Sequence, residues 1–485
     1  MLRLYDTLSR SLVEFKPIKP DQVLFYHCGP TVYWVQHIGN LRGMTMGDLL
    51  VRSLGHFGYK VRHVRNYTDV GHLISDADSG EDKMEKGARR EGTTPAQIAD
   101  KYIRIFENDT RVLNLLEPTF KPRPTQLIAE IIAMVETLIR NGYAYTTDLA
   151  VYYNISKFPA YSSLARQQIE MKQKGAGKGE VDDPQKRHFA DFALWIFKAG
   201  THAGALQTWP SPFATPQVAH GVGFPGWHIE CSVMAKIYLG DTIDIHMGGV
   251  EHIPVHHTNE IAQSEAANGV RFVRFWLHNE HLIVDRKKMA KSAGTGLTLE
   301  EVIGKGYDPM ALRYFYLTAH YRTRQNFTWQ ALENAALSLT QLRQIIFGIK
   351  KASGGRIRSS ISTEKLKKVD SYRFQFTAAL AADLNITQAL AVTWEVVKSN
   401  IPPQDKYDLI MDFDRVLGLN LDQDTAYSAI IDPEKLPDDI RQLIKSRESL
   451  RSQKRFSDAD EIRRQLTTLG YILDDTPDGY IVRKR

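Results

Sequence analysis

The chain has 485 residues, of which 43% are hydrophobic and 24% are charged, and its formal net charge at pH 7 is +6. This composition excludes an intrinsically disordered chain, and two cysteines over this length exclude a disulfide scaffold. Because no run of about 18 apolar residues is present, we expect no membrane span. The length predicts about three or four domains, and the low number of cysteines fits a cytoplasmic protein.

The first informative stretch joins a predicted strand to a predicted helix. Residues 23–26 form a short apolar run typical of a buried parallel strand, and residues 41–57 carry apolar residues at helical spacing. Ligands of doubly wound folds bind at such carboxyl ends of strands. The turn between the two elements begins with Cys28 and holds residues suited to a nucleotide and its phosphates: His37, Gly39 and Asn40. On its own this short match is common by chance.

A second segment, residues 285–292, is polar and basic and contains Lys288, Met289 and Lys291. A short basic run is most often a solvated loop, but ammonium groups on a moving loop can also bind a polyphosphate. In this order and about 250 residues apart, the two segments resemble the His-Ile-Gly-His and Lys-Met-Ser-Lys-Ser signatures of class I aminoacyl-tRNA synthetases. The resemblance implies that both segments bind ATP.

The two cysteines and the residues near them indicate a metal site in addition to the nucleotide site. Cys231 lies in a Gly-Trp-His-Ile-Glu-Cys-Ser segment, and downstream His256 and Glu260 are four residues apart, which puts them on one helix face. Two sulfurs, one imidazole and one carboxylate are a plausible tetrahedral zinc set, although their spacing does not match a compact zinc finger. Each residue alone is more often a buried structural side chain.

Together these segments resemble the cysteinyl-tRNA synthetase family, which has a Cys-Gly-x-Thr-Val-Tyr start and a Pro-His-His-x-Asn-Glu helix; here the proline of that helix stands one place earlier. The resemblance implies a zinc ion that recognises the thiolate of the substrate, held by Cys28, Cys231, His256 and Glu260. It also places Thr68, Trp227 and Cys28 beside the substrate cysteine. From the residues alone, Thr68 could equally cap a helix and Trp227 could equally be a core aromatic.

The same resemblance extends the ATP site to Gly248, Gly249 and Glu251, just past a predicted strand. The family usually has Asp where Glu251 stands, so a ribose contact from this residue stays open. Asn40 replaces the usual second histidine of the first signature, and Ala290 replaces the usual serine of the second. Because asparagine still donates a hydrogen bond and both lysines are kept, we expect an active enzyme.

We predict an α/β fold with a Rossmann-like, doubly wound parallel-sheet catalytic domain, an inserted subdomain, a following α-helical bundle and a small C-terminal α+β anticodon-binding domain. The expected divisions are residues 1–142 and 223–305 for the catalytic domain, 143–222 for the connective insertion, 306–328 for a stem-contact connection, 329–430 for the tRNA-binding bundle and 431–485 for the anticodon-binding domain. The mixed-sign run 74–92 is interpreted as a solvated face.

The implied reaction has two steps. L-cysteine and ATP give cysteinyl-adenylate and pyrophosphate, and the 3′ end of tRNA(Cys) then accepts the cysteine. Mg²⁺ accompanies ATP, one zinc is expected per chain, and a monomer is the expected state. The residues implied to stabilise charge on the phosphates are His37, Asn40, Lys288 and Lys291.

Two alternatives stay open. A ligase that joins cysteine to an amino-sugar would resemble the catalytic half, but residues 430–485 argue against it. A catalytically inactive RNA-binding relative would be expected to lose His37 or the lysines, and this chain keeps them.

Overall fold

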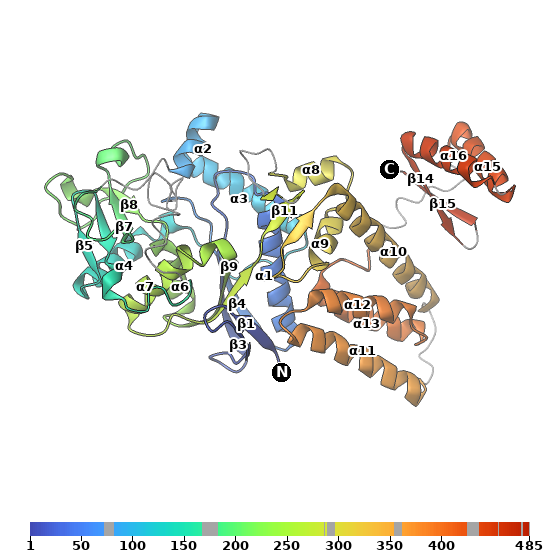
Figure 1. The fold of residues 1–485 in the computed structure, drawn as a ribbon, viewed down its shortest axis with the longest axis horizontal. Helices are drawn as coiled ribbons and strands as arrows, with labels where there is room; N and C mark the ends of the chain where they lie inside the picture. Colours follow the sequence, from blue (N-terminus) through green and yellow to red (C-terminus); the bar gives the residue numbers. More distant parts are fainter. Residues whose placement is uncertain are drawn as a thin grey trace.

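The computed structural model describes residues 1–71, 82–166, 183–285, 287–288, 296–353, 361–423, 436–453, 455–476 and 479–484. The N-terminal half is built on four parallel strands in the order β10-β9-β3-β4 (Figure 1). Their bounds are Gln22–His27 (β3), Lys60–Arg65 (β4), Ile243–Gly249 (β9) and Val273–Asn279 (β10). Consecutive residues of β3, Phe25 and Tyr26, pack into two different hydrophobic clusters, so this sheet is buried on both faces.

Helices cover both faces of this sheet. On one face α1 (Ile38–His56) packs against β4 and β9, and on the other α6 (Ile229–Leu239) packs against β3 and β4. Next to α6 lie α4 (Ile128–Arg140) and α7 (His256–Asn268). The result is the predicted doubly wound layer arrangement, in which the carboxyl ends of the strands meet at one edge.

An antiparallel sheet is inserted between α4 and α6 and lies at the end of the molecule opposite the helical bundle (Figure 1). Its strands follow in chain order as Ala144–Thr146 (β5), Ala150–Tyr153 (β6), Phe192–Phe197 (β7) and Gly223–Pro225 (β8). A separate hairpin of β1 (Arg3–Asp6) and β2 (Ser11–Glu14) begins the chain.

The charged run 83–91 forms helix α2 (Lys83–Glu91), which packs on α3 (Pro95–Val112). Met84 and Ala88, one turn apart, are buried, and Asp82 caps the helix N-terminus. The interpretation of this run as a solvated face is therefore wrong for the buried side of α2, because the charges surround a narrow apolar stripe. Residues 74–81 of the run lie outside the described residues.

Beyond the parallel sheet, a small sheet of β11 (Leu282–Val284), β12 (Lys287–Lys288) and β13 (Gln325–Phe327) leads to a helical region. Its helices are α8 (Leu299–Gly304), α9 (Pro309–Leu317), α10 (Trp329–Ser353), α11 (Thr363–Ala381), α12 (Ile386–Lys398) and α13 (Pro403–Leu417). Buried Arg313 of α9 joins this region to α1, because it donates to Asp48 Oδ2 (2.6 Å) and to Leu417 O at the end of α13 (2.9 Å).

The C-terminal part contains a helix pair and a hairpin, which agrees with the predicted small α+β domain. They are α15 (Asp438–Ser452), α16 (Phe456–Thr468), β14 (Tyr471–Thr476) and β15 (Gly479–Lys484). This part has a hydrophobic core of its own, made of Leu436, Ile440, Ile444, Leu466, Leu473 and Val482. Figure 1 shows it apart from the parallel sheet.

Candidate active site

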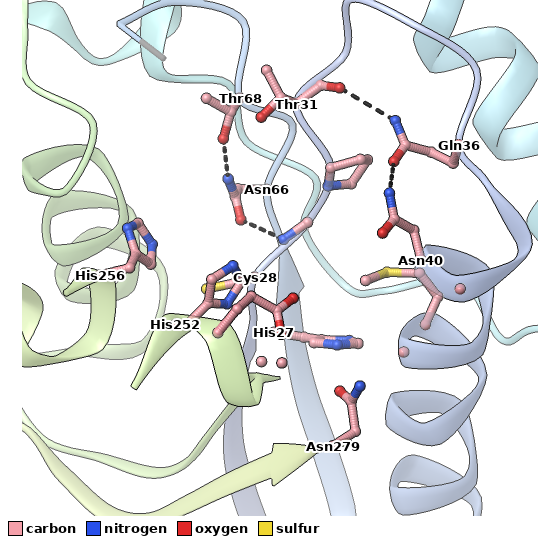
Figure 2. Close-up of a pocket in the computed structure, with 18 of the residues that line it drawn as sticks. His27, Cys28, Thr31, Gln36, Asn40, Asn66, Thr68, His252, His256 and Asn279 are labelled. Atoms are coloured by element: carbon pink, nitrogen blue, oxygen red, sulfur yellow. Dashed lines mark hydrogen bonds between the residues drawn. The ribbon is translucent and has the colours of Figure 1, made fainter. Parts of the chain in front are cut away.

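A cavity of about 430 Å³ opens where β3, β9 and β10 end. The loop after β3 and the first turns of α1 form one wall, and residues that follow β9 and β10 form the other. The structure brings most of the predicted site residues to this cavity: Cys28, His37, Gly39, Asn40, Thr68, Trp227, Cys231, Gly248, Gly249, Glu251 and His256. Figure 2 shows several of them from their different elements.

The start of α1 is organised by His37, its N-cap residue. His37 Nδ1 accepts a hydrogen bond from the backbone N–H of Asn40 (3.1 Å), so the proton of a neutral imidazole resides on Nε2. The amide of Asn40 donates to Gln36 Oε1 (2.5 Å), which fixes the exposed Asn40 side chain at the mouth of the cavity (Figure 2). The helix N-terminus therefore presents donors and a positive dipole end to this space.

Hydrogen bonds join the loops that follow β3 and β4 next to Cys28. Asn66 Oδ1 accepts from the backbone N–H of Gly29 (2.9 Å), and Asn66 Nδ2 donates to the Thr68 hydroxyl (3.0 Å), as Figure 2 shows. An ideal Cβ on Gly29 would lie 1.7 Å from Asn66 O, so only glycine permits this close approach of the two loops. Thr68, which is only 4% exposed, is thereby held against the loop that follows Cys28, opposite Thr31.

Four donors converge at the base of the cavity. Cys28 Sγ, Cys231 Sγ and one atom each of His256 and Glu260 all lie within 4.8 Å of one another, and all four side chains are buried. His256 Nε2 and Glu260 Oε1 are 3.0 Å apart, yet Oε1 accepts no hydrogen bond of good geometry from the described residues. Two donor atoms that face a common point without bonding each other fit a shared metal ion, and the sulfur-rich set suits zinc.

A second set of donors, Cys28, His246, His257 and Glu260, overlaps the first. His246 Nε2 lies 2.8 Å from Glu260 Oε2, and His257 Nε2 lies 3.4 Å from Cys28 Sγ. In the first set these two histidines are left to hold the carboxylate and the sulfur by hydrogen bonds, as the outer partners of metal ligands usually do. This makes the set with two cysteines the better candidate.

Further buried histidines extend this arrangement. His257 Nδ1 lies 2.7 Å from His278 Nε2, whose Nδ1 in turn lies 2.7 Å from Thr7 Oγ1. His228 Nδ1 lies 2.8 Å from His256 Nδ1. The sequence predictions did not include these residues. A signal was nevertheless present in the sequence. His257 and His278 stand in the helix that carries His256 and in a predicted strand, where an unpaired polar side chain is costly to bury.

Electrostatics favours the metal-binding form at two of the four donors, Cys231 and Glu260. A hydrogen bond from Cys28 lowers the pKa of the Cys231 thiol to about 6, while burial raises the pKa of the Cys28 thiol. Burial opposes ionisation of Glu260, but the charges of His246 and His256 hold the pKa of its carboxyl well below the usual range. Anionic sulfur and carboxylate are the ligand forms that zinc requires.

Trp227 forms part of the wall next to the donors. Its ring lies 4.7 Å from the ring of His256 and 5.1 Å from that of His228, and Lys83 Nζ lies 5.9 Å from its centroid. Because Trp227 also lines the cavity, it is a wall of the site and not only a core aromatic.

The opposite wall is formed by Gly248, Gly249 and Glu251. A Cβ on Gly248 would lie 2.6 Å from His252 Nδ1, and a Cβ on Gly249 would meet the Glu251 carboxylate. These glycines therefore make room for side chains of the protein as well as for a ligand. Glu251 Oε2 lies 3.5 Å from His281 Nδ1, and both side chains are partly exposed at the mouth of the cavity.

The second sequence signature is only partly described. Lys288 ends β12, but its side chain lies outside the described residues, as do Met289 and Lys291. Where the described chain resumes, Leu297 O accepts from the backbone N–H of Ile38 (2.8 Å). The segment that follows the lysine signature is thus bonded directly to the start of α1.

Comparisons with known proteins agree with this geometry. A family model described as the tRNA synthetases class I (C) catalytic domain matches residues 14–337, and one described as the cysteinyl-tRNA ligase anticodon binding domain matches residues 434–483. The chain belongs to the cysteinyl-tRNA synthetase family. It is 44% identical to the cysteine–tRNA ligase 1 of Burkholderia lata, covering 99% of this chain and 96% of that protein, and 40% identical to the cysteine–tRNA ligase of Treponema denticola, covering 98% of each.

A methionyl-tRNA synthetase of Mycobacterium tuberculosis, solved with methionyl-adenylate, shares the fold at a TM-score of 0.55 and 12% identity, covering 82% of this chain and 90% of that one. The predicted family and class I fold are thereby confirmed, and a cysteinyl-tRNA synthetase, an enzyme, is favoured over an amino-sugar ligase or an inactive RNA-binding relative. Across the described ranges, which leave out gaps such as 72–81, no helix is long and apolar enough to cross a membrane.

Proposed function

We propose that this member of the family joins L-cysteine to tRNA(Cys) in two steps, through cysteinyl-adenylate. The observation that carries the proposal is the buried donor set of Cys28, Cys231, His256 and Glu260 at the base of the same cavity whose mouth holds His37 and Asn40. One cavity thus offers a site for a thiolate and a site for phosphates. Its residues and its place at the sheet edge suit an amino acid and a nucleotide bound side by side.

The donor set fits zinc, which when bound would supply a Lewis-acidic position for the sulfur of the substrate. Cys28, Cys231, His256 and Glu260 would hold the ion, and His246 and His257 would hold two of these ligands in place by hydrogen bonds. A serine hydroxyl stays protonated and is a poorer ligand than a thiolate, so the same site rejects the near-isostere of cysteine.

At the other end, His37 Nε2–H and the N-terminus of α1 would bind the phosphates of ATP, with Asn40 beside them. We propose that Lys288, Met289 and Lys291 bind the same phosphates, supported by the hydrogen bond that joins Leu297 to Ile38. Mg²⁺ would accompany ATP. Gly39, Gly248, Gly249 and Glu251 would line the adenosine, and Thr68 and Trp227 the substrate cysteine.

In the first step the carboxylate of cysteine attacks the α-phosphate of ATP, and pyrophosphate leaves. The protein supplies no nucleophile; its residues orient the two substrates and stabilise charge that develops on the phosphates. In the second step the terminal adenosine of the tRNA attacks the adenylate. We propose that residues 329–430 lie along the tRNA and that residues 431–485 read its anticodon, supported by the anticodon binding domain match. Monomeric state and cytoplasmic location stay predictions of the sequence.

The test is cysteine-dependent exchange of pyrophosphate into ATP, with zinc content measured on the same sample. We expect exchange with cysteine and not with serine, and charging of tRNA(Cys). Cys231→Ser and Glu260→Gln are expected to lose zinc and exchange together.

Asp241→Asn is a matched control, because its carboxylate is 55% exposed and outside the cavity, so zinc and exchange should stay normal. A folded, zinc-loaded protein without cysteine-dependent exchange would refute the proposed activity. Exchange without charging of tRNA would instead favour transfer of cysteine to another acceptor.

A further inference from the structure

Asn279 has a side chain that no step above uses. It is the last residue of β10, pairs in register with Gly249 of β9, and lines the cavity although it is only 9% exposed. Figure 2 shows its carboxamide directed into the cavity, below His27. A buried amide aimed into a binding cavity needs hydrogen-bond partners, because an unpaired one costs free energy.

The protein supplies few of these partners. Among the described residues, the one hydrogen bond of the Asn279 side chain runs from Nδ2 to Glu280 O at 3.5 Å, the outer limit for such a bond. A carboxamide can donate two hydrogen bonds and accept two. One donor and the whole acceptor oxygen are therefore available to a ligand.

The orientation of the amide is fixed. Glu280 O is held by buried Arg42, whose Nη1 donates to it at 2.5 Å. Turning the Asn279 amide over would place Oδ1 against this carbonyl oxygen, so Nδ2 stays on the side of Glu280 and Oδ1 on the other. The amide thus presents an ordered donor and acceptor pair.

The surroundings of the amide suit a flat ring. Gly39 and Gly43, one helical turn apart on α1, form a strip without side chains along the cavity, and apolar Met44 lies beside it. A Cβ on Gly43 would lie 3.5 Å from both Oδ1 and Nδ2 of Asn279. The amide therefore rests against the end of the strip, where the edge of a base lying on the glycines would meet it.

We infer that Asn279 selects the base of the nucleotide: Oδ1 accepts from the 6-amino group of adenine and Nδ2 donates to the ring nitrogen beside that group. An asparagine amide matches adenine in this way, whereas guanine carries a carbonyl oxygen at position 6 that Oδ1 repels. The inference rests on the proposed binding of ATP in this cavity. It makes Asn279 a specificity-determining residue of the first step.

The test compares ATP with purine riboside 5′-triphosphate, which lacks the 6-amino group, in cysteine-dependent exchange by the zinc-loaded enzyme. Since one such amide pair discriminates by about 1–3 kcal/mol, the wild type should prefer ATP by about tenfold in kcat/KM. Asn279→Ala should lose most of this preference, because its activity should fall more with ATP than with the analogue, which shares only the ring-nitrogen contact with ATP. Zinc content and KM for cysteine should not change. The 7-deaza and 1-deaza analogues of ATP then identify the ring nitrogen.

Met44→Leu is the matched control, because it changes an apolar side chain of the same cavity and should affect both nucleotides alike. A wild type that uses ATP and purine riboside triphosphate equally would overturn the inference, and this measurement needs no variant. So would an Asn279→Ala enzyme whose activity falls equally with both nucleotides. Absence of exchange with any nucleotide would instead refute the proposed activation of cysteine.

Discussion

Replacing Gly29 by alanine tests whether the contact between the exits of β3 and β4 positions the site. The added Cβ would lie 1.7 Å from Asn66 O and 2.8 Å from Asn66 C. Both are backbone atoms, which cannot turn aside as the end of a side chain can. Because carbon does not approach oxygen closer than 3.0 Å, the two loops would have to separate by more than an ångström.

This separation would act directly on the donor set. The hydrogen bonds from Gly29 N to Asn66 Oδ1 (2.9 Å) and from Val32 N to Thr68 O (3.1 Å) span the gap that has to widen. Cys28 is the neighbouring residue, so its sulfur would move relative to the other three donors. Since a misplacement of about 1 Å can cost about 100-fold in rate, we expect Gly29→Ala to lower kcat/KM for cysteine by about that factor.

The assay is cysteine-dependent pyrophosphate exchange, with zinc content and thermal midpoint measured alongside. Gly55→Ala on α1 is the control, because a Cβ there meets nothing within 4 Å. It should keep full activity and gain up to about 1 kcal/mol from helix propensity. If Gly29→Ala retained kcat/KM within about threefold of wild type and bound zinc normally, the reasoning from this contact would be refuted.

The parallel sheet could be predicted because its information is local. The apolar run at residues 23–26 and the helical spacing that follows it correspond to β3 and α1, and the C-terminal part has the mixed helices and strands of the predicted α+β domain. The boundaries moved by one to three residues: α1 begins at Ile38, directly after its N-cap His37, whereas the predicted helix began at residue 41.

The convergence of the donor set could not be derived from spacing. Cys28 and Glu260 are more than 200 residues apart in the sequence, and only the pairing of β3 with β9, which puts Tyr26 opposite His246, brings them together. The family resemblance, and not the spacing, identified the four ligands that the fold brings together. The histidines that hold these ligands, His246 and His257, lay beyond both, because a histidine beside a buried strand or helix signals a hydrogen-bond partner without identifying it.

Three further changes test the energetics. His246→Ala removes the hydrogen bond that holds the carboxylate ligand, and should weaken zinc affinity by about 10–100-fold in a competitive chelator titration; unchanged affinity would contradict the proposed bracing. Arg313→Met removes one of the two arginines that pair with buried Asp48, together with the donor to Leu417 O, and should cost about 1–3 kcal/mol, seen as a lower thermal midpoint. Arg415→Met, whose side chain is 84% exposed, should leave the midpoint unchanged. Equal thermal midpoints for the two variants would be evidence against a stabilising role for the contact between Arg313 and Asp48. The third change tests how stability depends on pH. Burial and the charge of Glu300 raise the pKa of Asp109 from 3.8 to about 7. The folded chain therefore holds a proton that the unfolded chain releases between these values, so this group makes stability fall as pH rises from about 4 to about 7. Asp109→Asn should accordingly be more stable than wild type at about pH 8, with the difference shrinking as the pH approaches about 4. Thermal midpoints measured across this range would contradict the assignment if the two proteins changed in parallel.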